Sequence, residues 1–290
     1  MSYTRFQPMI DSAARRPQLW RLIAGVITVF AIATAWTAGT FLAAERLWGV
    51  SVFGLIEGNS PLGTALFLST VAGGFGVGTW ISAVAWQRRR LSDLIGRSAR
   101  TLQDFVRAAM TTFVLAAIAW IVFLPFAEPL KPNLPFDQWL RWLPIALLLI
   151  LLQTGAEELL FRGYLQSQLA ARFRPIWVWL LAPSLLFGLL HYMPTETAGP
   201  GLLYVASTTL FGVIAADLTA RTGSIGAAWG LHFANNCLAI LVVVYLGAAS
   251  GLGLYSAGTI EDALTLSPLL LLDVGVLVLL WLVIRRIVTL

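Results

Sequence analysis

Long stretches without a charged side chain dominate this chain and restrict what it can fold into. Residues 22–44 are 23 consecutive positions that contain no Asp, Glu, Lys or Arg. A helix of this length crosses the roughly 30 Å hydrocarbon layer of a membrane. Hydrophobic residues make up 58% of the chain and charged residues only 11%, whereas soluble domains average about 25% charged. We therefore expect an all-α, polytopic membrane helix bundle.

Charge-poor segments predict about eight transmembrane helices. They lie at about 22–44, 62–86, 108–127, 142–172, 175–193, 200–216, 224–247 and 264–284. The first is longer than the 7–15-residue core of a secretory signal, so we expect it to be a retained span. Together the spans predict a single membrane domain over residues 1–290.

The positions of Lys and Arg indicate how these spans are oriented. With a cytoplasmic N-terminus, 16 of the 19 basic residues fall in inside segments, and only Arg46, Lys131 and Arg141 fall outside. Basic residues concentrate on the cytoplasmic side of membrane proteins. The distribution predicts that both termini are cytoplasmic and attributes the net charge of +5 to topology, with no nucleic-acid partner. It suits a bacterial inner membrane, with an organellar membrane as the alternative.

The basic segment between the second and third spans has its own pattern. Within residues 88–107, apolar positions recur near helical spacing among arginines. This is typical of an amphipathic helix lying on the inner membrane surface. The alternative is an ordinary basic connector that continues into the third span.

Three of the predicted spans contain polar side chains deep within apolar sequence. Glu157, Glu158 and Arg162 lie in the fourth span, His191 ends the apolar part of the fifth, and His232 with Asn236 lies in the seventh; the chain has no other histidine. An ionisable residue inside a membrane is costly, so such residues are functional candidates by default.

Helical spacing suggests a different task for each of these side chains. Glu158 and Arg162 are four residues apart and can form an ion pair, which leaves Glu157 as the freer carboxylate and a candidate general base. His232 and Asn236 are also four apart, so an imidazole and an amide face one spot. Such a pair suits a carbonyl or the oxyanion formed when water attacks it.

Counting residues from the predicted inner turns places these groups in depth. Glu157 and His191 each lie 17 residues from Arg174, which puts both about 25 Å above that turn and lets them face each other. His232 lies 10 residues from Thr222, or about 15 Å. The seventh span must therefore start deeper or tilt. The fourth span is long for one straight crossing, so it must tilt, break near Gly155 or Gly163, or project into the cytosol.

The three motifs together resemble a known family. Glu157-Glu158 with Arg162, Phe187 with His191, and His232 with Asn236 are similar to the E-E-x-x-x-R, F-x-x-x-H and H-x-x-x-N motifs of the CPBP intramembrane proteases, which include the type II CAAX prenyl endopeptidases and bacteriocin-processing relatives. The resemblance covers about residues 142–240. It implies an intramembrane protease in which the first glutamate and both histidines are essential and the asparagine assists.

The resemblance and the residue types together define a predicted reaction. We expect an endopeptidase that cleaves near the C-terminus of a peptide or lipidated protein in contact with membrane lipid. Glu157 activates water, and His191, His232 and Asn236 stabilise the oxyanion. Glu157 with both histidines could also supply a His₂Glu zinc set, although the HExxH spacing is missing. We favour direct activation of water by Glu157.

Other functions fit the same residues. A buried Glu and His could form the proton relay of a transporter, and the chain could instead be a non-catalytic immunity or scaffold protein. Single polar residues in a bundle often only bond neighbouring helices. The protease interpretation accounts better for an asparagine one turn from a histidine, which a proton relay does not need.

Overall fold

The computed structural model describes residues 3–57, 59–123, 129–192, 198–246, 250–259 and 267–289. Most of them are helical. The elements in chain order are η1 (Thr4–Phe6), α1 (Gln7–Ala14), α2 (Leu19–Trp48), α3 (Val52–Glu57), α4 (Pro61–Gln87), α5 (Leu91–Ile95), α6 (Ser98–Phe123), β1 (Lys131–Pro132), α7 (Phe136–Glu158), the π-helical η3 (Leu159–Gln166), α8 (Ser167–Ala170), α9 (Ile176–Leu190), α10 (Ala198–Thr222), α11 (Gly226–Cys237), the π-helical η4 (Leu238–Val242), β2 (Val243–Leu246), β3 (Tyr255–Thr259) and α13 (Ser267–Thr289).

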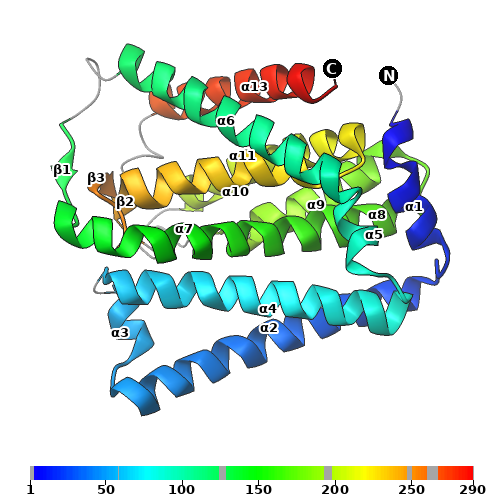
Figure 1. Cartoon of the computed structure of the whole chain (residues 1–290), viewed down its shortest axis with the longest axis horizontal. Coiled ribbons are helices and arrows are strands. Elements are labelled where there is room, and N and C mark those ends of the chain that lie inside the picture. The colour runs from blue at the N-terminus through cyan, green and yellow to red at the C-terminus, as the bar shows by residue number, and fades with distance from the viewer. Residues whose placement is uncertain are drawn as a thin grey trace.

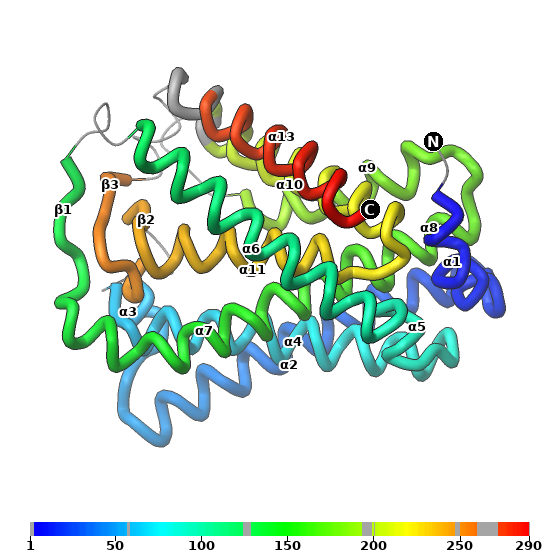
Figure 2. Tube along the Cα trace, turned by 45° about the horizontal axis from the view of Figure 1, so that its top comes forward, coloured from blue at the N-terminus to red at the C-terminus, as the bar shows by residue number. Residues whose placement is uncertain are grey.

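The long helices run side by side along one axis (Figure 1). Helix α4 packs between α2 and α7, α11 packs against α7, α6 and α10, and α9 packs on α10. Helix α13 lies beside α10 and α6, as Figure 2 shows from a second angle. The N- and C-terminal ends lie at the same end of the bundle, and α3 and the strands lie at the other end.

A helix is present at each of the eight predicted spans. Within the described residues, five helical stretches are long and apolar enough to cross a membrane: 19–48, 61–87, 98–123, 136–170 and 201–222. Residues 176–190 and 226–242 form shorter apolar helices. The count of eight spans and the cytoplasmic placement of both termini stay predictions.

A small sheet departs from the expected all-α class. Its strand order is β1-β3-β2, with β1 antiparallel and β2 parallel to β3. The register pairs Lys131 with Ser256 and Val243 with Tyr255. Residues 242–245 read Val-Val-Val-Tyr, and β-branched and aromatic residues favour strands. The seventh span therefore gives way to a strand after Val242, before its predicted end at 247.

The segment 88–107, expected as one amphipathic helix, is divided in the structure. Helix α5 ends at Ile95, because the φ of 83° at the following Gly96 breaks the helix, and α6 begins at Ser98. Leu94 is fully buried, and the nearby Arg89 guanidinium donates hydrogen bonds to Ser167 and to the Asp93 carbonyl. The short α5 is thus packed against protein, while the placement of this segment at a membrane surface stays a prediction.

Small residues allow close helix packing around the site. A Cβ on Gly74 in α4 would lie 2.8 Å from the Cα of Ala33 in α2. A Cβ on Gly188 in α9 would lie 2.7 Å from the carbonyl oxygen of Val205 in α10. Because lipid gives helices little hydrophobic reason to associate, close contacts of this kind stabilise membrane bundles. They fix α9 and α10 relative to each other and so position the side chains that α9 presents.

Candidate active site

Two adjacent glutamates lie where α7 changes into the π-helical segment η3. Glu158 is fully buried, and its Oε1 lies 3.2 Å from Nη1 of Arg162. The predicted ion pair is therefore confirmed. The guanidinium of Arg162 also lies 4.8 Å from the centre of the Phe187 ring, where a cation is attracted by the π electrons. The fourth span does not break near Gly155 or Gly163, since residues 136–170 form one helical stretch. Within it, Leu159–Gln166 has π-helical geometry, which was not predicted, and π segments are frequent at functional sites.

His232 on α11 lies between the two carboxylates. Its Nδ1 is 2.7 Å from Oε1 of Glu158, and its Nε2 is 3.5 Å from Oε2 of Glu157. Glu158 is already paired with Arg162 and so accepts a hydrogen bond as a carboxylate, which requires that Nδ1 of His232 carry the proton. The other ring nitrogen, Nε2, faces Glu157. Phe187 and Phe211 pack edge-on around the imidazole.

Glu157 is the less constrained of the two carboxylates, as helical spacing predicted. It is buried, and its Oε2 accepts no hydrogen bond from the described residues. Buried acceptors are nearly always satisfied. Oε2 of Glu158 also lacks a partner among the described residues, but the other oxygen of Glu158 is engaged by both Arg162 and His232, so Glu157 is the carboxylate with fewer contacts.

The predicted difference in depth between His232 and the glutamates is explained by where α11 starts. The turn between α10 and α11 lies inside the protein, with Ser224 fully buried and the amide of Ile225 donating to the carbonyl of Ile95. A Cβ on Gly223, whose φ is 71°, would lie 2.1 Å from the carbonyl oxygen of Arg5. The N-terminal segment thus covers this turn, and α11 starts deep enough to bring His232 to Glu158.

His191 and Asn236 face the same cavity as His232 but make different contacts. Nδ1 of His191, at the end of α9, is 2.8 Å from the carbonyl oxygen of Phe187. No hydrogen bond or ion pair between described residues joins His191 to Glu157. Asn236 donates through Nδ2 to Oε1 of Gln153, at 3.1 Å. The structure therefore joins Glu157, Glu158, Arg162 and His232 into one connected group, with His191 and Asn236 on the adjoining wall.

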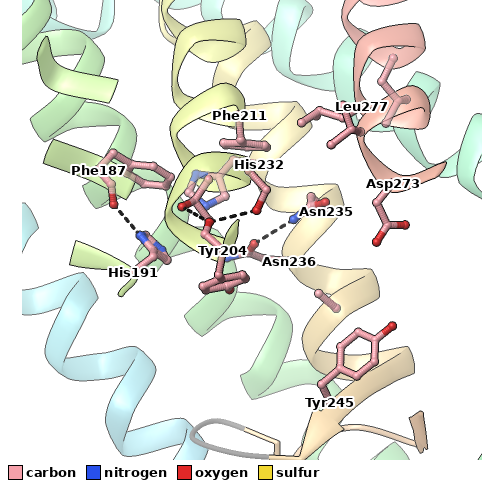
Figure 3. A pocket seen from close by; sticks show the side chains of 15 residues that line it. Phe187, His191, Tyr204, Phe211, His232, Asn235, Asn236, Tyr245, Asp273 and Leu277 are labelled. Atoms are coloured by element: carbon pink, nitrogen blue, oxygen red, sulfur yellow. Dashed lines mark hydrogen bonds between the residues drawn. The ribbon is translucent and has the colours of Figure 1, made fainter. Parts of the chain in front are cut away.

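The cavity beside His232 has a volume of about 400 Å³ and lies between α9, α10, α11 and α13 (Figure 3). Tyr204, Phe211, Tyr245 and Asp273 also line it, and sequence reasoning assigned none of them a role. Gln153 was missed too, although one signal was present: it is a polar residue four positions before Glu157 in the same apolar helix. The aromatic residues gave no such signal because aromatic residues are common throughout the chain.

The donor groups do not match a zinc site. Catalytic zinc takes three protein ligands at about 2 Å, and among the described residues no group of three His, Cys, Asp or Glu side chains is placed to hold a metal ion. Glu158 is engaged by Arg162 and His232, and no hydrogen bond, ion pair or three-ligand cluster among the described residues brings His191 together with Glu157. The arrangement thus lacks the His₂Glu geometry considered above.

Comparisons with known proteins agree with the motifs. Residues 139–238 match the family model described as type II CAAX prenyl endopeptidase Rce1-like. The chain is also 32% identical over 114 residues to the uncharacterized protein YyaK of Bacillus subtilis (strain 168). That match covers 39% of this chain and 37% of YyaK. No solved structure gives a significant match.

The matched region contains all six predicted site residues. Together with the five long apolar helices, the match supports an integral, multi-pass membrane protein. The predicted resemblance to the CPBP family is therefore confirmed over residues 139–238, which match its type II CAAX prenyl endopeptidase branch.

Proposed function

We propose that this protein is an intramembrane endopeptidase in which Glu157 activates water for attack on a peptide carbonyl. The observation that carries the proposal is the position of His232, which lies between Glu157 and Glu158 and faces an aromatic cavity. The family match over the same residues supports it.

Each side chain has a task in this reaction. Glu157 takes a proton from water as the water oxygen bonds to the carbonyl carbon, and later gives that proton to the departing amine as the C–N bond breaks. Glu158, held by Arg162, fixes the tautomer and orientation of His232. Asn236 uses one amide hydrogen on Gln153 and has a second for the oxyanion, to which His191 and His232 contribute from the same cavity wall.

The substrate class follows from the family and the membrane setting. We propose a peptide or lipidated protein in contact with membrane lipid, cleaved near its C-terminus, as the description of a prenyl endopeptidase family suggests. Because water is activated by a carboxylate, a chelator should leave the rate unchanged.

The test is cleavage of fluorogenic peptides, lipidated and unlipidated, by detergent-purified protein. Glu157→Gln should lower kcat by about 10²–10⁴-fold, which is the contribution of a general base. Glu45→Gln, on the exposed face of α2, is the matched control and should retain full activity. Cleavage by Glu157→Gln at the wild-type rate would exclude this mechanism. Loss of activity on chelation would show that a metal carries the water.

A further inference from the structure

The cavity beside His232 has an unbalanced charge. Asp273 of α13 is the one acidic residue among its lining side chains, and the lining contains no Lys or Arg. Figure 3 shows Asp273 across the cavity from His191. Because Leu277 and Leu280 follow it at helical spacing and line the same cavity, Asp273 belongs to the face that α13 turns toward the site.

Within the described part of the chain, Asp273 forms no ion pair. The salt bridges of the described residues involve other carboxylates. The segments outside the described residues contain no Lys or Arg in their sequence, so they offer no cation either. The described residues leave the side chain of Asp273 uncovered, as a group that meets a ligand must be.

The neighbouring polar groups are rich in hydrogen-bond acceptors. Asn235 on α11 donates through its amide nitrogen to Oδ1 of Asn236, which leaves its own carbonyl oxygen as an acceptor. Tyr245 on β2 contributes a phenol oxygen to the same cavity. A carboxylate with an amide carbonyl and a phenol suits a cation that carries several N–H donors.

We propose that Asp273 determines specificity by binding a cationic group of the substrate, so that the preferred substrates are peptides with a basic residue near the scissile bond. This inference rests on the proposed function, whose cavity and reaction it uses. A cation would be attracted across a cavity that is apolar on most sides, where charges interact more strongly than in water. A free C-terminal carboxylate beside Asp273 would instead be repelled.

The test measures binding separately from cleavage. N-acetylated peptides that differ only by Lys, Leu or Glu at one position are titrated into Glu157→Gln protein in nanodiscs of zwitterionic phosphatidylcholine, with the position scanned along the peptide. A Leu peptide with a free N-terminus forms a fourth arm and separates an N-terminal ammonium from a basic side chain as the cation. Zwitterionic lipid removes the attraction of basic peptides to an anionic surface.

We expect the Lys peptide to bind about tenfold more tightly than the Leu peptide at one position. Adding Asp273→Asn should remove that preference, and Asp273→Lys should shift it to the Glu peptide. Asp137→Asn removes the same charge at the exposed start of α7 and should preserve the preference. Equal binding of all peptides, or a preference unchanged in Asp273→Asn, would overturn the proposal.

Cleavage by the wild type then tests the two proposals independently. Cleavage with a lower KM for Lys peptides supports both. Cleavage without charge preference supports the protease and excludes the role of Asp273. Charge-selective binding without cleavage of any peptide would retain the cationic ligand and reject the protease.

Discussion

At the scale of single residues, the site is organised by a buried arginine. Arg162 is 1% exposed and lies between the carboxylate of Glu158, the carbonyl of Gly212 and the ring of Phe187. Glu158 in turn accepts the Nδ1 proton of His232. One cation thus compensates one carboxylate and, through it, sets the orientation of the imidazole, while Glu157 stays less constrained.

Removal of Arg162 should destabilise the protein more than removal of the whole pair. Arg162→Met leaves Glu158 buried without its cation, and breaking a buried pair in this way costs about 3–5 kcal/mol. The double variant Glu158→Gln/Arg162→Met buries no unpaired charge and should regain much of the loss. Thermal unfolding in detergent measures both. Equal melting temperatures for the two variants would show that the ion pair has no such role.

Asn236 should act on the chemical step more than on binding. Asn236→Ala removes an amide donor from the cavity wall, and loss of one oxyanion donor slows acyl transfer by about 10²–10³-fold. We expect kcat to fall by that amount while KM changes little, as steady-state kinetics with the best peptide would measure. A rise in KM with unchanged kcat would instead assign Asn236 to substrate binding.

At the scale of elements, α9 depends on its close contact with α10. Phe187 and His191 are four residues apart on α9 and its C-cap, and Gly188 lies in close contact with α10. A side chain at position 188 would meet Val205 and Thr209 within 3 Å. The positions of Phe187 and His191 therefore depend on the absence of a side chain at position 188, where α9 contacts α10.

A substitution in that contact should reduce activity from outside the reacting groups. Gly188→Val should displace α9 from α10, lower the melting temperature and slow cleavage at least tenfold, because a 1 Å misplacement can cost up to about 10²-fold. Gly39→Val in α2 is the matched control, since a Cβ there has nothing within 4 Å, and it should behave as wild type. A fully active Gly188→Val would show that α9 tolerates the shift.

At the scale of the whole molecule, the apolar runs predicted the helix that is found at each of the eight spans. The arginine bias predicted both termini on one side of the membrane, and both lie at the same end of the bundle (Figure 1). The N-terminal segment adds a contact that no pattern indicated: the Tyr3 hydroxyl donates to Oδ1 of Asp217, and Trp281 donates to Oδ2 of the same carboxylate. Burial and the neighbouring Asp217 raise the pKa of Tyr3. The first hydrogen bond joins residues 214 positions apart and the second joins residues 64 apart, and helical periodicity predicts neither contact.

The difference between contacts within one helix and contacts between helices also explains which parts of the site the sequence could predict. The Glu158–Arg162 pair is local and follows from a spacing of four residues. The contact of His232 with Glu158 and that of Gln153 with Asn236 connect separate helices, whose rotation and depth depend on the buried turn at Ser224. The strand at Val243 was missed because a run of apolar β-branched residues also fits the end of a membrane helix.

The predicted orientation can be measured directly with cysteine labelling. Cys237, the single cysteine, is buried, so Cys237→Ser gives a background without thiols. Arg97→Cys and Lys131→Cys then place one thiol at each end of the bundle, both at exposed positions. A membrane-impermeant maleimide should label position 131 in intact cells and position 97 only after lysis. Labelling of position 97 in intact cells and of position 131 only after lysis would show the opposite orientation in the membrane.

The buried turn before α11 has a consequence for how the protein is made. Helix α11 and the π-helical η4 that continues it form one helical stretch over residues 226–242, which is about 25 Å long and so shorter than the roughly 30 Å hydrocarbon layer. Its first residues are covered by the N-terminal segment and by α5 and α6, so it can settle only after these earlier parts are in the bilayer. The histidine that meets both glutamates can therefore take its place only when α11 packs against these earlier parts, and a chain that ends before α11 has both glutamates without His232.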